Sequence, residues 1–201
     1  MYRKRQKDVV HFFKMERGLV VCSDIESLMQ TLNINHNPLD WRLFIDSSKL
    51  SHKTFLLHYT NTTHSIPVGH SEHNKESYEN MKSLMQTINY DKFKWQIFGD
   101  LKAIALLLAL QQVFTKYCCF ICEVESRTRS LHYSRKDWPA RKSLEPGIMN
   151  VENQPLVEPS KILLPSTYLK LGLMKKFLKA MNEEEAAFTY EKSSSDEVRQ
   201  I

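Results

Sequence analysis

Two aspartates are the first residues of this sequence whose type and spacing suit chemistry. Asp46 ends the run Trp41–Asp46, and Asp100 follows the run Trp95–Gly99. Two carboxylates that lie close together repel unless a cation lies between them, and their hard oxygens select Mg²⁺ or Mn²⁺. Asp46 and Asp100 are therefore candidate metal ligands if the fold brings them together. Either aspartate alone is typical of a helix N-cap or a surface acid.

A group of cysteines is the second candidate. Cys119 and Cys122 have the C-x-x-C spacing that lets two thiolates bind one Zn²⁺, and His132 follows as a candidate third ligand. A fourth ligand would be water, Cys118 or another histidine. The alternative is that the cysteines are small buried apolar residues. A thioredoxin-like redox pair is not favoured, because the motif lacks a βαβ setting.

The elements that must position the aspartates follow one alternating pattern. β-branched and aromatic runs predict four strands, apolar residues at helical spacing predict two helices, and the first three strands are expected to form an antiparallel meander. A helix before the fourth strand lets that strand lie parallel to the first, which brings Asp46 and Asp100 to one edge of the sheet. The order is β-β-β-α-β-α, with these ranges: Trp41–Asp46, Lys53–Tyr59, Ile66–His70, Lys75–Asn89, Trp95–Gly99 and Leu101–Gln112. A short capped helix is also predicted between Ser23 and Leu32.

Composition excludes several function classes. The 201 residues carry a net charge of +5 and only five glycines, none spaced as in a dinucleotide-binding or P-loop motif. No G-x-S-x-G hydrolase motif is present. The apolar run Ala103–Leu110 is far shorter than the roughly 20 residues that cross a bilayer, and Met1–Lys7 is not an apolar signal segment. We expect a nuclear or cytoplasmic protein that is not secreted and has no membrane or small-molecule partner.

Positive charge is concentrated in two stretches: residues 1–17 hold six basic residues and two acids, and residues 161–179 hold five lysines and no acid. Between them, residues 123–160 interleave six basic residues with Tyr133 and Trp138. Such stretches favour polyanions through counterion release and aromatic stacking. The alternative is a solvated basic surface on an irregular insertion. The candidate nucleic-acid contacts are Arg127, Arg129, Lys170, Lys175 and Lys176.

Several long phrases carry a resemblance to a known group. They are Trp41–Lys49, Tyr78–Lys82, Gly99–Lys102, Val113–Cys122, Ser143–Gly147 and Lys170–Lys175. In these phrases the sequence resembles transposon-derived proteins that have a DDE transposase or ribonuclease H-like core. The resemblance implies an α/β fold with a mixed ribonuclease H-like sheet, followed by a zinc-capable, cysteine-rich and basic C-terminal extension.

The resemblance also implies a function. Asp46 and Asp100 would be the first two acids of a metal-dependent phosphodiester reaction, with Mg²⁺ or Mn²⁺ as the cofactor. The third acid of such proteins lies beyond the matching part, and Tyr168 replaces a histidine of the relatives. We therefore expect a transposase-derived protein that lacks catalytic activity and binds DNA. The alternative is a metal-dependent DNA nuclease or strand transferase that uses Asp46 and Asp100.

Four segments are expected along the chain. Residues 1–38 form a basic N-terminal segment with a short helix, and residues 39–122 form the ribonuclease H-like core. Residues 123–181 form a basic insertion and a C-terminal helix, and residues 182–201 form an acidic tail that is predicted to be disordered.

Overall fold

The computed structural model describes residues 9–16, 18–47, 51–71, 77–112, 115–132, 134–164, 170–175 and 177. The chain divides into two compact units, residues 1–164 and residues 165–201. The predicted acidic tail lies outside the described residues. None of the described helices is long and apolar enough to cross a membrane.

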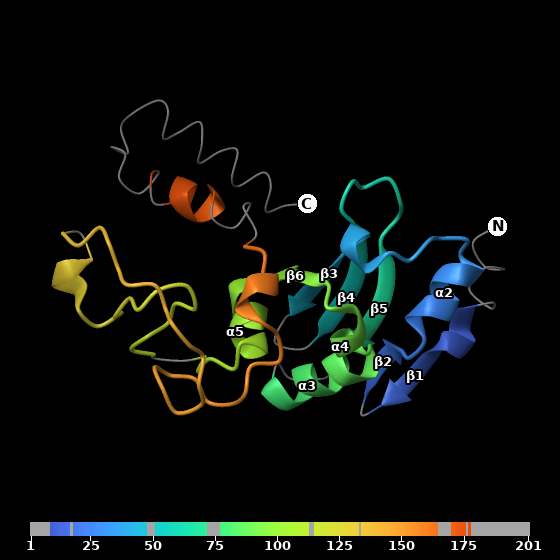
Figure 1. Cartoon of the computed structure of the whole chain (residues 1–201), viewed down its shortest axis with the longest axis horizontal. Coiled ribbons are helices and arrows are strands. Elements are labelled where there is room, and N and C mark those ends of the chain that lie inside the picture. The colour runs from blue at the N-terminus through green and yellow to red at the C-terminus, as the bar shows by residue number, and fades with distance from the viewer. Residues whose placement is uncertain are drawn as a thin grey trace. The chain divides into compact units, whose positions relative to one another are not determined.

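A mixed six-stranded sheet forms the centre of the first unit (Figure 1). Its strand order is β1-β2-β5-β4-β3-β6, and every neighbouring pair is antiparallel except β3 and β6, which are parallel. The predicted meander and the predicted parallel pair are confirmed, and the fold is α/β. The strands are β1 (Phe13–Glu16), β2 (Leu19–Cys22), β3 (Trp41–Ser47), β4 (His52–His58), β5 (Ile66–Ser71) and β6 (Gln96–Gly99).

Side chains of four helices pack with the buried residues of the strands in one core, and α3 and α4 run together below the strands in Figure 1. A Cβ added at Gly69 would lie 3.1 Å from Leu84 of α3, and one added at Gly99 would lie 3.8 Å from Ala103 of α5. An ion pair of 2.8 Å between Lys92 and Glu26 joins α4 to α2. The helices are α2 (Ile25–Thr31), α3 (Tyr78–Thr87), α4 (Tyr90–Phe93) and α5 (Leu101–Leu107), and the 3-10 turns are η1 (Val10–Phe12), η2 (Pro38–Asp40), η3 (Arg129–Leu131) and η4 (Pro159–Lys161).

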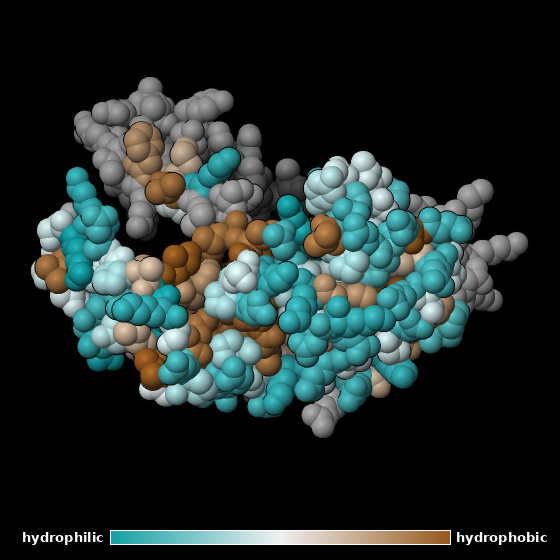
Figure 2. Space-filling model, viewed as in Figure 1, coloured by the Kyte–Doolittle hydropathy of each residue, from teal (hydrophilic) through white to brown (hydrophobic). Residues whose placement is uncertain are grey.

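The main core lies between the sheet and these helices. Alternate residues of the strands point into it, so that Leu43, Ile45 and Ile97 are completely buried. The apolar side chains of α3 meet them from the helix side, which is the reason for the helical spacing of its apolar residues. A second buried cluster joins α5 to residues 144–162 and includes Ile104 and Val151. Figure 2 shows apolar surface over α5, whose first residue, Leu101, is 55% exposed.

The structure differs from the predicted elements at three places. Strands β1 and β2 extend the sheet within residues 1–38, where only a helix was expected. Helix α5 ends at Leu107 instead of Gln112, because Ala109 adopts a positive φ of 55° and its carbonyl accepts a hydrogen bond from Glu152. The helix expected up to Asn89 ends at Thr87, and α4 follows it as a separate helix. The expected start at Lys75 lies outside the described residues.

Residues 115–164 form few regular elements. Isolated bridges hold this segment together, such as Tyr117 with Glu125 and Cys122 with Ala140. Ile162 bridges to Ile97 and Leu163 donates a backbone hydrogen bond of 2.7 Å to the same residue, so the segment returns to the edge of the sheet at β6. In the second unit, residues 170–175 and 177 are helical.

Candidate functional site

The sheet register sets the positions of Asp46 and Asp100. Ile45 of β3 lies opposite Gly99 of β6 in the parallel pair. Asp46 directly follows Ile45, and Asp100 directly follows Gly99. The two aspartates therefore lie at the carboxyl ends of adjacent parallel strands. Phe44 and Phe98 form the preceding pair on the same face, because side chains two residues apart along a strand point the same way.

Gly99 allows the two strands to approach. A Cβ at this position would lie 2.4 Å from the carbonyl oxygen of Ile45, a distance that real Cβ atoms do not show. A glycine is needed here because backbone fills the space that a side chain would take. The residue that allows this close contact, Gly99, is thus directly followed by the carboxylate of Asp100.

The two aspartates differ in their surroundings. Asp100 is half-buried and is the N-cap of α5, where its Oδ1 atom accepts a hydrogen bond of 2.6 Å from the backbone N–H of Ala103. Asp46 is exposed and lies opposite Lys53 of β4. The described residues hold no group of three or more His, Cys, Asp or Glu side chains that could bind a metal ion. Asp46 and Asp100 therefore form a pair at this edge, without a third such ligand among the described residues.

Cys119 and Cys122 lie within the short hairpin that the bridge between Tyr117 and Glu125 closes. The backbone N–H of Ile121 donates to the Sγ atom of Cys119 at 3.4 Å, and the N–H of Val124 donates to the thiol of Cys122.

The surroundings of the Cys122 thiol also shift its pKa. Burial and the neighbouring Cys119 thiol raise the pKa of Cys122, whereas the Val124 N–H lowers it. Each thiol thus accepts an N–H from the residue two positions further on. The pair has the chemistry of two Zn²⁺ ligands.

Arg141 lies beside this hairpin and was counted in the sequence only as one basic residue among several. Its guanidinium donates to the carbonyl oxygens of Cys119, at 2.6 Å, and Met149. In the described part of the chain its buried Nε atom has no hydrogen-bond partner. Burial lowers the pKa of Arg141, whereas negative charge on Cys119, Glu123 and Cys122 raises it. Arg141 is thus a half-buried cation beside two thiols, of which Cys122 has a raised pKa and keeps its proton.

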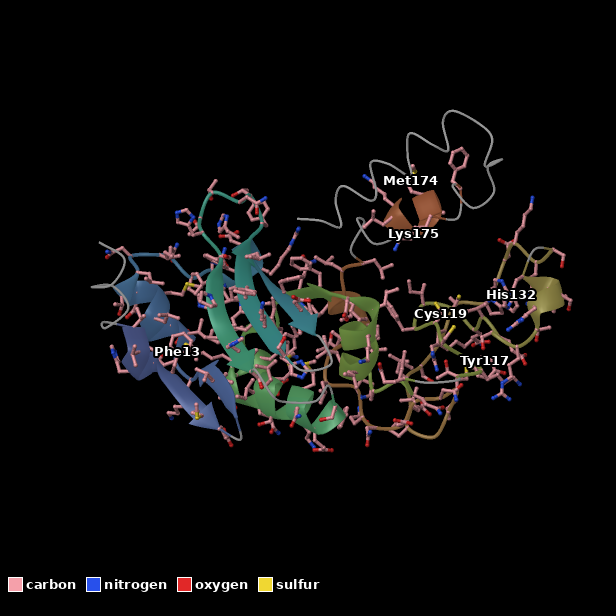
Figure 3. All side chains as sticks on the ribbon, turned by 180° about the vertical axis from the view of Figure 1, so that it is seen from behind. Phe13, Tyr117, Cys119, His132, Met174 and Lys175 are labelled. Carbon is pink, nitrogen blue, oxygen red and sulfur yellow. The ribbon has the colours of Figure 1, made fainter. Side chains whose placement is uncertain are left out.

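His132 is not brought to the cysteines. Its Nε2 atom is hydrogen-bonded to the carbonyl oxygen of Glu125 at 2.8 Å, and its ring meets Trp138 edge to face. Figure 3 shows His132 and Cys119 at separate places along this segment. Cys118, the alternative ligand, is exposed. Cys119 and Cys122 are therefore the pair that the described structure brings together.

The predicted nucleic-acid contacts lie in both units. Arg127 and Arg129 are exposed around η3, within residues 127–142, which we call the basic segment. In the same segment the guanidinium of Arg135 lies over the ring of Trp138, 4.6 Å from its centre. In the second unit Lys170 and Lys175 are exposed on the helical residues (Figure 3), and Lys176 lies outside the described residues.

Comparison with known proteins places the chain in a family. A search of curated proteins finds no match. The family model described as a domain of unknown function (DUF8703) matches residues 1–157, which include the whole sheet, both aspartates and the cysteine hairpin. The chain therefore belongs to the DUF8703 family.

Proposed function

We propose that this chain is a transposase-derived, nucleic-acid-binding protein with a ribonuclease H-like core that does not cleave its ligand. The observation that carries the proposal is the position of Asp46 and Asp100 at the ends of the parallel pair β3 and β6. The strand arrangement supports it, since the antiparallel strands β3, β4 and β5 precede a strand that returns parallel to β3. This is the order that the resemblance implies.

The binding function is supported by the basic segment. Arg127 and Arg129 are exposed, and Arg135 stacks on Trp138 beside them. Exposed arginines contact phosphates and release counterions, and a nearby ring offers a surface for bases. Lys170 and Lys175 would add phosphate contacts from the second unit.

The absence of cleavage rests on the sequence. The resemblance supplies two acids, Asp46 and Asp100, in the matching part of the chain, and we propose that these two alone do not support cleavage. Asp46 and Asp100 would hold Mg²⁺ or Mn²⁺ and thereby neutralise the phosphate charge of a bound strand.

Salt-dependent binding tests the proposal. The full chain is titrated into labelled DNA at several salt concentrations, and the double variant Arg127→Gln, Arg129→Gln is compared with it. We expect weaker binding to every sequence and a salt slope that is smaller by about two, since each phosphate contact contributes about one to that slope. The matched control Lys82→Gln, Lys92→Gln removes two exposed lysines of α3 and α4 and should change neither quantity. Absent or salt-independent binding would contradict the proposal.

A nuclease is the second candidate, because the two aspartates meet at one edge. It predicts cleavage of DNA with Mg²⁺ or Mn²⁺ that Asp46→Asn abolishes. Intact DNA after incubation with either metal, in single-stranded and duplex form, favours the binding protein over the nuclease.

We also propose that Cys119 and Cys122 hold Zn²⁺, which would fix the hairpin of residues 117–125. The support is the C-x-x-C spacing, the Ile121 N–H that donates to Cys119 and the neighbouring Arg141. Metal analysis of purified protein should find zinc that Cys119→Ser, Cys122→Ser removes. Cys22→Ala changes a buried cysteine of β2 and should leave the zinc content unchanged. His132→Asn tests whether the histidine completes the site.

A further inference from the structure

Three phenylalanines form one row across the sheet. Phe44 of β3 lies opposite Phe55 of β4 on one side and opposite Phe98 of β6 on the other. Adjacent strands are about 4.8 Å apart, so the three side chains stand next to one another on one face. The rings of Phe44 and Phe98 have their centres 4.9 Å apart at an angle of 40°. We call Phe55, Phe44 and Phe98 the phenylalanine row.

The row lies on the face away from the helices. The residues that alternate with it, such as Leu43 and Ile45, point to α3 and α5 and are completely buried. Phe44, Phe55 and Phe98 are only half-buried. They belong neither to the two buried clusters of the described residues nor to the apolar side chains packed against them. The core therefore does not account for three aromatic side chains in one row.

Positive side chains flank the row along the strands. Arg42 stands two residues before Phe44 on β3, and Lys53 stands two residues before Phe55 on the antiparallel strand β4. Two residues span about 6.6 Å along a strand, so the cations lie in the rows on either side of the rings. Asp46 shares a row with Lys53, which gives that carboxylate a positive neighbour.

This arrangement matches a known way of reading nucleic acids. Bases of single strands stack on aromatic side chains of an open sheet, and cations beside the rings contact the phosphates. A duplex keeps its bases paired and stacked inside, so its bases cannot use such a surface. An apolar protein helix would use the rings but would leave Arg42 and Lys53 without a role.

We propose that the phenylalanine row is a stacking platform for the bases of single-stranded nucleic acid, with Arg42 and Lys53 contacting the phosphates on either side. The inference rests on the proposed nucleic-acid binding and adds its substrate class. Binding then has two components. The basic segment contributes mainly phosphate contacts, and the row contributes most of the base contacts.

Oligonucleotides with and without bases separate these components. The full chain is titrated at several salt concentrations with labelled oligothymidine of about 12 nucleotides, which is within the site size of single-strand-binding domains. An abasic sugar-phosphate strand of equal length and a duplex are the comparison ligands. We expect oligothymidine to bind about five-fold or more tightly than the abasic strand, since a single stacked base contributes at least that much.

Variants assign the difference to the row. Phe44→Leu, Phe98→Leu keeps apolar side chains but removes two of the three rings, so affinity for oligothymidine should fall towards that for the abasic strand, with an unchanged salt slope. Arg42→Gln, Lys53→Gln keeps the rings and should lower the salt slope. The control Phe93→Leu removes a ring of α4 that packs on the core side and should leave binding unchanged. Circular dichroism melting checks that each variant is folded.

The possible results are distinct. Equal binding of oligothymidine and the abasic strand, or unchanged binding by the folded Phe44→Leu, Phe98→Leu variant, overturns the stacking platform and leaves the proposed function standing. A change in the mass of that variant in solution without a change in affinity would make the row a protein contact and also overturn it. Binding of none of the three ligands overturns the proposed function itself.

Discussion

Asp100 combines two roles that its sequence position leaves open. One carboxylate oxygen caps α5, while the position beside Asp46 makes the same side chain a candidate metal ligand. A carboxylate has two oxygens and about four lone-pair sites, so a cap and a metal contact are compatible. The two roles make different demands on the side chain, which lets substitutions separate them.

Asn and Ala at position 100 should give different results. Asp100→Ala removes the cap and should lower the free energy of unfolding by about 1 kcal/mol, whereas Asp100→Asn keeps a good N-cap and should change it little. Both substitutions should weaken Mn²⁺ binding. Asp46→Asn, which changes an exposed side chain, should weaken it as well. Urea unfolding and Mn²⁺ titration measure the two effects. Full Mn²⁺ affinity in Asp100→Asn would remove Asp100 from the metal site.

His36 predicts a loss of stability in acid. The indole N–H of Trp95 donates to its Nε2 atom at 3.3 Å, which requires that nitrogen to be unprotonated. Burial lowers the pKa of His36; Glu26 opposes this shift and Lys92 adds to it. Stability from this group is therefore complete above the unfolded pKa of about 6.5 and is lost as the pH falls towards the lower folded pKa.

Thermal melting between pH 8 and pH 5 measures this effect. The melting temperature should fall with pH in the native chain and fall less in His36→Gln, which cannot be protonated. His11→Gln changes an exposed histidine and should behave like the native chain. Equal pH dependence in all three proteins would show that His36 contributes nothing to it.

Single residues were placed correctly from the sequence where the order of strands and helices alone decides their position. Asp46 and Asp100 were expected at one edge because a crossover helix makes their strands parallel, and the register agrees. Arg141 was not identified, because it reaches Cys119 only through the pairing of Cys122 with Ala140. That pairing joins two irregular segments, and neither shows hydrophobic periodicity.

The parallel pair β3 and β6 is the element on which the aspartate pair depends. Ala at position 99 would put its Cβ 2.4 Å from the backbone of Ile45, so one strand must move. Gly99→Ala should therefore destabilise the protein by about 1–3 kcal/mol or more and also weaken Mn²⁺ binding. Urea unfolding and metal titration check both effects.

Gly172→Ala is the matched control for this substitution. Gly172 lies among the helical residues of the second unit, and a Cβ there meets nothing within 4 Å. Its substitution should be neutral or stabilising, since alanine is the better helix former. If Gly99→Ala is equally harmless, the two strands are not held together in the way described.

Elements were predictable where one periodicity runs over several residues. The four strands from Trp41 onward and helix α3 were found by their apolar patterns. Strands β1 and β2 were missed because each has four residues and β1 carries Lys14 and Glu16. Gly18, with a φ of 79° between them, was the available signal of a hairpin. The end of α5 was missed because the apolar run continues past Ala109.

The whole molecule consists of two units, and both buried clusters lie within the first. A chain of residues 1–164 should therefore fold alone, with a melting temperature within a few degrees of that of the full chain. It should keep the preference for oligothymidine over the abasic strand and lose the phosphate contacts of Lys170 and Lys175. Thermal melting and DNA titration test this, and a truncated chain without a cooperative transition would contradict it.

At this scale the sequence located the α/β sheet but not its extent. The expected boundary between residues 38 and 39 separates β2 from β3, although both strands belong to one sheet. The segment after residue 122 was expected as an extension, and its return to β6 through Ile162 depends on a single bridge. A single bridge between residues so far apart in the sequence leaves no periodic pattern in that sequence.

Strand β1 is the terminal strand of the described sheet, which has a consequence for behaviour at high concentration. An outermost strand offers unpaired backbone groups to other molecules and can begin fibril growth. Here it has only four residues, and its Lys14 and Glu16 are exposed. Short length and outward charge are the features with which natural sheets discourage such growth, so solutions of this protein should resist gelling through this strand.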